Sequence, residues 1–119
     1  MSHMFRDAEI FNQPVSFNTS NVTNMEHMFY GAKAFNQPVS FNTSNVTNMV
    51  GMFSYANAFN KPLYFDTSKV ISMSGMFDGA KAFNQPIKFS NTSNVTDMSY
   101  MFKQAKKFNK PVNFDTRNV

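Results

Sequence analysis

The chain has 119 residues, a length that allows one modest domain and little more. It has no cysteine, which excludes a disulfide framework and thiolate metal sites, and no apolar run approaches the roughly 20 residues that cross a bilayer. The formal net charge is +4 and 42% of the residues are hydrophobic, yet 15 Phe and 10 Met accompany no Trp. Because so few residue types supply the apolar side chains, we expect internal repeats.

The repeats begin with the string FNQPVSFNTSNVTNM, which starts at Phe11, returns at Phe35, and recurs in altered form at Phe59, Phe83 and Phe108. The period is 24 residues, with a last step of 25 where an added residue within 89–92 predicts a bulge. We interpret residues 1–3 as a cloning remnant and 4–119 as a single repeat domain. Its parts are a half repeat at 4–10, repeats at 11–34, 35–58, 59–82 and 83–107, and a partial repeat at 108–119.

The first element predicted in each repeat is a short strand. Val15 and Phe17 alternate with a polar residue, which is the spacing of a half-buried strand, and Val22 is a candidate centre for a second one. Stacked repeats would pair such strands in parallel.

The second predicted element is a short helix. Met25, Met28, Phe29 and Ala32 follow the i, i+3, i+4, i+7 spacing of an amphipathic helix, and Asn24 stands before them as a preferred N-cap. The repeat therefore predicts an α/β solenoid of leucine-rich-repeat type, with one short strand and one short helix in each 24–25-residue coil and parallel stacking.

We call the residues at the same position of successive repeats a column. Two polar columns do not vary between repeats. We expect them to form structural ladders, in which each side chain bonds the backbone of its own or the next coil. The columns are Asn12, Asn36, Asn60, Asn84 and Asn109, and Thr19, Thr43, Thr67, Thr92 and Thr116.

A resemblance to a known family rests on the pattern T-S-N-V-T-N-M-x-x-M-F-x-x-A-x-x-F-N-Q-P, which runs from Thr19 to Pro38 and recurs along the chain. It resembles the repeat of about 25 residues found in BspA-like leucine-rich-repeat bacterial surface proteins, including mycoplasma surface lipoproteins of unknown function. The resemblance implies an extracellular or cell-surface location, a role in adhesion or host interaction, and no catalytic residues.

The residues offer little for catalysis. His3 lies in the interpreted remnant, so His27 stands alone, and without cysteine a nucleophile and base would have to come from carboxylates and hydroxyls. No phosphate-binding glycine loop is present. We expect no enzyme activity, no cofactor and no metal site.

Charge is uneven along the chain. Residues 1–58 carry a net charge of −1 and residues 59–119 a net charge of +5, with Lys103, Lys106, Lys107 and Lys110 the densest group. Such a patch suits nucleic acid, anionic lipid or acidic glycans, but a solvated lysine face is the simpler interpretation. No nucleic-acid-binding motif accompanies the lysines, so nucleic acid is not an expected partner.

Binding residues are expected in the columns that vary, because their side chains are not needed for the packing that the constant columns provide. All four tyrosines occupy such columns, and exposed tyrosine is common in recognition surfaces, although packing over a helix face explains them equally well. The candidate binding face consists of Tyr30, Tyr55, Tyr64, Tyr100, His27 and Lys103.

These observations favour a non-enzymatic, surface-displayed repeat module that recognises a protein or glycan, whose identity the sequence leaves open. The alternative is a structural spacer or stalk segment of a larger surface protein. Since the end coils would expose Phe5 at one end and Phe108 and Phe114 at the other, we also expect end-to-end association of copies.

Overall fold

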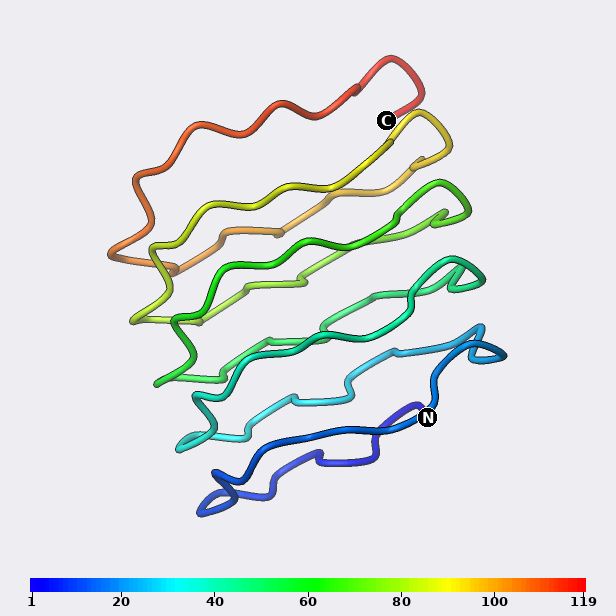
Figure 1. The fold of residues 1–119 in the computed structure, drawn as a ribbon. Coiled ribbons are helices and arrows are strands. Elements are labelled where there is room, and N and C mark those ends of the chain that lie inside the picture. The colour runs from blue at the N-terminus through cyan, green and yellow to red at the C-terminus, as the bar shows by residue number, and fades with distance from the viewer.

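The computed structural model describes all 119 residues. The chain winds into a stack of flattened coils, one for each repeat, with the first coil at one end and the last at the other (Figure 1). Each coil has two long runs on opposite sides of the stack, illustrated by residues 59–66 in front and 73–80 behind. The stack measures 38 × 32 × 19 Å.

The coils contain neither helices nor extended strands. The only β pairing consists of isolated parallel bridges, which join Asn24 to Asn48, Asn48 to Ser72, Ser72 to Asp97, and Leu63 to Ile87. The predicted α/β solenoid of leucine-rich-repeat type, with a strand and a helix in each coil, is therefore wrong. What recurs from coil to coil is a series of tight turns.

Consecutive turns take the place of the predicted helix. The N–H of Met28 donates to the carbonyl of Met25 at 3.3 Å, and Ala32 donates to Phe29 at 3.1 Å, so the hydrogen bonds span three residues instead of four. His27 has a φ of +51° and Gly31 a φ of +67°, values that a right-handed helix does not contain. The apolar residues nevertheless reach the core, because the turns place them on the inner side at the same spacing.

Alternate N–H groups in this part of the coil donate hydrogen bonds to carbonyls of the next coil. His27 donates to Val50, Phe29 to Met52 and Gly31 to Ser54, each at 2.9 Å. We call residues 3–7, 27–31, 51–55, 75–79 and 100–104 the turn segments, and the same register joins each of them to the next. Backbone groups are thus satisfied without regular secondary structure.

Phenylalanine stacks run through the core. The ring centroids of Phe29 and Phe53 lie 5.4 Å apart and those of Phe53 and Phe77 5.8 Å apart, with interplanar angles of 6° and 4°. Within one coil, Phe29 and Phe35 stack at 4.3 Å, which joins two phenylalanine columns. Offset stacking at these separations is the favourable geometry for aromatic pairs.

The asparagine column links successive coils along its length. The backbone N–H of Asn36 donates to Asn12 Oδ1 at 2.8 Å, and Asn60 and Asn84 repeat the bond to the preceding asparagine at 2.9 Å. Asn109 continues it to Asn84. The inner members are half-buried.

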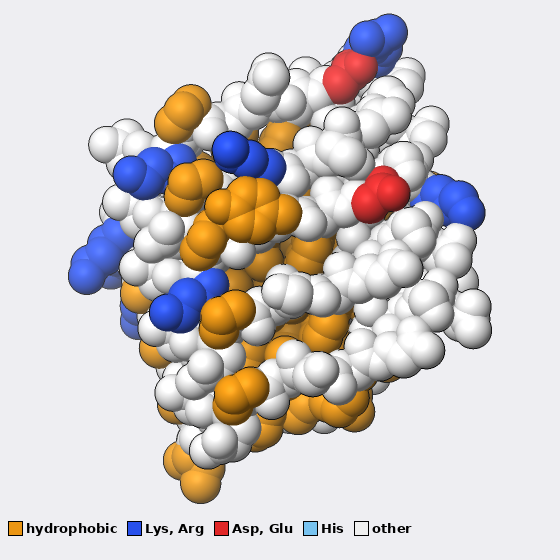
Figure 2. All heavy atoms as spheres, in the orientation of Figure 1, with side chains coloured by type: hydrophobic (Ala, Val, Ile, Leu, Met, Phe, Trp, Pro, Cys, Tyr) orange, Lys and Arg blue, Asp and Glu red, His pale blue; other side chains and the backbone are white.

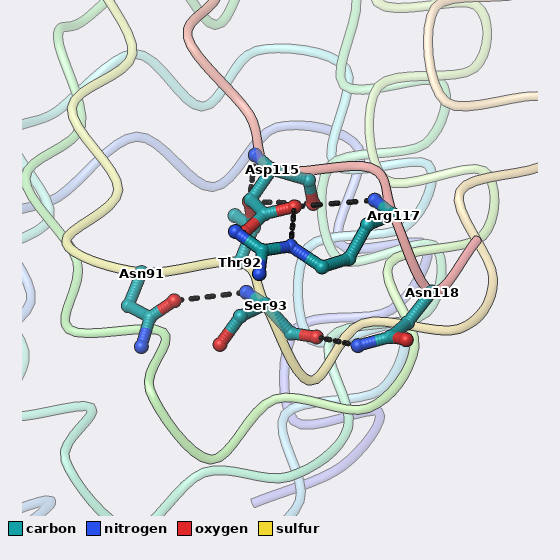
Figure 3. A network of polar contacts seen from close by, with 6 residues as sticks. All are labelled: Asn91, Thr92, Ser93, Asp115, Arg117 and Asn118. Carbon is teal, nitrogen blue, oxygen red and sulfur yellow. Dashed lines mark hydrogen bonds and ion pairs between the residues drawn. The ribbon is translucent and has the colours of Figure 1, made fainter.

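The threonine column lies deeper in the stack. Thr19 Oγ1 donates to the carbonyl of Asn42 at 2.9 Å, and Thr43, Thr67 and Thr92 make the equivalent bond. Figure 3 shows the surroundings of Thr92, the last of these donors. There the Asp115 N–H donates to Thr92 Oγ1 at 2.7 Å, and the Asn118 side chain donates to the Ser93 carbonyl. Thr116 is exposed.

The predicted N-cap residue Asn24 and the equivalent residues of later repeats form local turns. Asn24 Oδ1 accepts the N–H of Glu26 at 2.8 Å, and Asn48 and Asp97 accept from the residue two positions later in the same way. These are Asx turns, which satisfy the backbone where no helix follows.

Candidate binding face

The left-handed backbone positions of the turn segments coincide with two of the columns that vary. Every residue with positive φ belongs to the column of His27 or to that of Gly31. The glycines adopt this conformation freely, whereas non-glycine residues pay a steric cost. The residues that vary in these two columns therefore also differ in how readily they adopt a left-handed backbone. The non-glycine members are His3, Asp7, His27, Tyr55, Tyr100 and Gln104.

Large side chains at these positions lie across glycines of the next coil. A Cβ placed on Gly51 would overlap the ring of His27, and one placed on Gly79 would overlap the ring of Tyr55. His27 and Tyr55 therefore have a packing role as well as an exposed edge. The sequence suggested that the tyrosines pack over a helix face and not over glycines of the next coil, although the alternation of glycine with large residues in the column of Tyr55 was visible in it.

Four side chains from three coils meet on this side of the stack. The His27 and Tyr30 rings contact edge to face at 5.1 Å, Tyr30 and Tyr55 do so at 5.6 Å, and the Arg6 guanidinium carbon lies 4.9 Å from the centre of the Tyr30 ring. We call Arg6, His27, Tyr30 and Tyr55 the aromatic cluster. Arg6 shares the column of Tyr30, and this shared column is the signal that could have identified it.

His27 lies at the edge of the aromatic cluster. Its Nδ1 is 3.2 Å from His3 Nε2. Burial lowers the pKa of His27 from its ordinary value, the positive charges of His3 and Arg6 lower it further, and Glu26 acts in the opposite direction. The neutral ring is thus favoured at neutral pH.

The other candidates lie apart from the aromatic cluster. Tyr100 and Lys103 pair on the last turn segment, with the ammonium nitrogen 5.1 Å from the ring centre. Tyr64 lies on the run 59–66, on the opposite side of its coil from the turn segments (Figure 1), where Lys88 approaches its ring at 6.0 Å. The structure therefore divides the predicted face into two sides.

The side that bears the run 59–66 is basic toward its last coils. Figure 2, in the same orientation, shows Lys and Arg side chains over the upper part of this face and none over the lowest coils. A groove of about 500 Å³ lies between the last two runs. It is lined by Pro86, Ile87, Lys88, Lys110, Pro111, Val112 and Asn113.

The carboxylates support turns. Hydrogen bonds from Ser68 lower the pKa of Asp66, those from Ser99 lower the pKa of Asp97, and those from Arg117 lower the pKa of Asp115. No group of three His, Cys, Asp or Glu side chains is placed to hold a metal ion. The structure also has no helix able to cross a membrane.

Comparisons with known proteins identify a family. No curated protein and no solved structure matches the chain. The family model described as "Mycoplasma protein of unknown function, DUF285" matches residues 1–64 and 39–119, which together cover the whole sequence. This match supports a mycoplasma repeat family and does not extend to BspA-like leucine-rich-repeat identity. The chain therefore belongs to the DUF285 family, whose function is unknown.

Proposed function

We propose that the chain is a non-enzymatic repeat module, displayed at the cell surface, that recognises a protein or glycan through the aromatic cluster. The observation that supports this is the contact of Tyr30 with Arg6, His27 and Tyr55 across three coils. Tyrosine and arginine supply much of the energy at recognition surfaces, since they offer large contact areas and directed hydrogen bonds.

The partial exposure of the aromatic cluster suits contact with a ligand. Tyr55 is exposed and Tyr30 and His27 are half-buried, so the cluster combines accessible rings with limited freedom to move. Their packing against neighbouring coils reduces the entropy lost on binding. A flat sugar face or an aromatic or aliphatic side chain of a protein fits such a surface.

Binding to arrays of glycans and host proteins tests this proposal. The informative variants are Tyr30→Ser and Tyr55→Gly, because Ser54 and Gly79 already occupy the same columns and the substitutions are compatible with the coil. We expect each to weaken binding by about tenfold or more, as is typical of a central aromatic residue. Tyr64→Ser, on the opposite side, is the matched control and should leave affinity unchanged.

Binding that survives both cluster substitutions would refute the assignment of the face. Protease accessibility on intact cells tests surface display separately. A spacer or stalk segment is the second candidate function, favoured by the constant hydrogen-bond register, which lets coils add length without changing their contacts. This second function predicts that neither the unsubstituted chain nor any variant binds a glycan or protein on the arrays.

A further inference from the structure

Two neighbouring runs, 59–66 and 83–90, are joined by backbone hydrogen bonds in the middle of the stack. Leu63 donates to the Pro86 carbonyl at 3.3 Å and Lys88 donates to the Leu63 carbonyl at 2.9 Å, which forms the parallel bridge between Leu63 and Ile87. No other two successive runs on this side of the stack are bridged. The bridge therefore fixes how the side chains of these two runs lie relative to one another.

The bridge places Tyr64 beside Lys88 on the outer surface. Because side chains alternate along extended runs, Leu63 and Ile87 are buried, whereas Tyr64 is 64% exposed and Lys88 is exposed. The Lys88 ammonium nitrogen lies 6.0 Å from the centre of the Tyr64 ring. Lys61 lies three residues before Tyr64 on the same run. An accessible aromatic ring and two ammonium groups thus belong to one small part of the surface.

The positive charge of this region is not neutralised by carboxylates. None of the three ion pairs in the structure involves Lys61 or Lys88. The carboxylate on these runs is that of Asp66, whose pKa is held low by hydrogen bonds from Ser68 and Ser90. Figure 2 shows basic side chains beside hydrophobic ones where the runs begin, and acidic side chains only toward the side where the runs end.

We propose that Lys61, Tyr64 and Lys88 form a binding site for an acidic glycan. A sugar ring packs its C–H groups on the Tyr64 ring, and its carboxylate or sulfate groups accept charge-assisted hydrogen bonds from the lysines. Asp66 repels the same anionic groups and so directs them toward Lys61 and Lys88. The site lies on the opposite side of the stack from the aromatic cluster, so it does not depend on the proposed function.

Other anionic partners fit this surface less well. Binding at a lipid surface uses apolar side chains that enter the membrane, but the outward neighbours of Tyr64 on its run are Pro62 and Asp66. Single-stranded nucleic acid stacks successive bases on a series of aromatic side chains, and the column of Tyr64 contains no second aromatic residue. One ring between ammonium groups favours a charged sugar.

Calorimetric titration at low salt with oligosaccharides of heparin and of hyaluronan tests the proposal, with neutral dextran for comparison. The variants copy residues of the same columns, because Gln37 corresponds to Lys61 and Ser40 to both Tyr64 and Lys88. At least one acidic glycan should bind, and dextran should not. We expect binding to weaken about tenfold in Tyr64→Ser and about threefold in Lys61→Gln and in Lys88→Ser.

Lys69→Asn is the matched control. It removes the same charge from the same coil, beyond Asp66, and Asn45 and Asn94 already occupy its column. We expect it to leave the affinity unchanged. Asp66→Asn, which copies Asn42, should strengthen binding about twofold because it removes a repelling charge. Unchanged thermal unfolding temperatures confirm that each variant is folded.

Three results would each overturn the proposal. The first is no binding of either acidic glycan. The second is equal weakening by Lys69→Asn and Lys88→Ser, which indicates attraction to the overall charge and no site. The third is tighter binding of single-stranded DNA or of vesicles containing anionic lipid than of either glycan, with the same response to the variants. Acidic glycan binding that responds to Tyr30→Ser and not to Tyr64→Ser also refutes this site, and would place the ligand on the aromatic cluster.

Discussion

At the scale of single residues, the left-handed positions of the turn segments can be tested with matched glycines. Gly75 and Gly79 have φ values of +61° and +69°, so alanine at either is strained by about 1–2 kcal/mol. Only at Gly79 does the added Cβ also meet the Tyr55 ring, since the nearest atom to a Cβ on Gly75 is Asp78 Cβ at 3.9 Å. We expect Gly79→Ala to lower the free energy of unfolding by about 1 kcal/mol more than Gly75→Ala.

The same experiment contains its own control. In a Tyr55→Gly background the ring is absent, and the cost of Gly79→Ala should fall to that of Gly75→Ala. Urea denaturation of the four variants and the parent provides these free energies. An undiminished cost in the Tyr55→Gly background would contradict the packing role of Tyr55.

His27 predicts a dependence of stability on pH. Burial holds its pKa below the ordinary value of 6.5, so below that pH the unfolded chain binds the proton more readily than the folded chain. The free energy of unfolding should therefore decrease as pH falls through 6.5 and be highest above it. Denaturation at about pH 7.5 and pH 5.5 measures this decrease, and His27→Gly should reduce it. An equal decrease in that variant would assign the effect to other groups.

At the scale of elements, the turn segments show where sequence periodicity is ambiguous. Met25, Met28 and Phe29 face the core at helical spacing, but the spacing arises from consecutive turns with left-handed residues between them. Glycine occupies only four of these positions, and the other six carry non-glycine residues such as His27 and Tyr55, which give no sign of a left-handed backbone. The repeat register and the members of each column could be predicted because they depend only on which residue types recur. The backbone conformation of the turn segments could not.

The candidate site was likewise predictable from the sequence only in part. The columns identified Tyr30 and Tyr55 as variable, but their contact with Arg6 depends on the separation of adjacent coils and on rotamers that the repeat pattern does not reveal. Tyr64 was grouped with them although it lies on the opposite run of its coil. Residue variation indicates freedom from the core and does not indicate which side of the coil a residue occupies.

Far-ultraviolet circular dichroism tests the absence of helices. The turn segments have hydrogen bonds of three-residue span and crossing bonds to the next coil, so the folded chain should lack the double minimum of helical proteins. Thermal unfolding followed by near-ultraviolet signals from the tyrosines confirms that the sample is folded. A helical spectrum from folded protein would contradict the turn architecture.

At the scale of the whole molecule, stability should depend on whole coils. Each coil contacts its neighbours through the same register, and the junctions Ala34–Phe35 and Ala58–Phe59 are identical. Deletion of residues 35–58 therefore joins Ala34 to Phe59 with every column continuous. His27 would then lie over Gly75, which has open space like that filled at Gly51.

The shortened chain should fold and unfold cooperatively, with lower stability and with a denaturant slope about one fifth smaller, since that slope scales with the surface exposed. Deletion of residues 35–46 removes only half a coil and shifts every later column out of register with residues 11–34, so in this control the first coils should lose their hydrogen bonds to the rest of the stack. Hydrogen exchange at Phe29, whose amide donates across the junction, distinguishes the two. Equal damage from both deletions would show that the chain folds as an indivisible unit, whereas survival of the whole-coil deletion alone makes the coil the unit of stability.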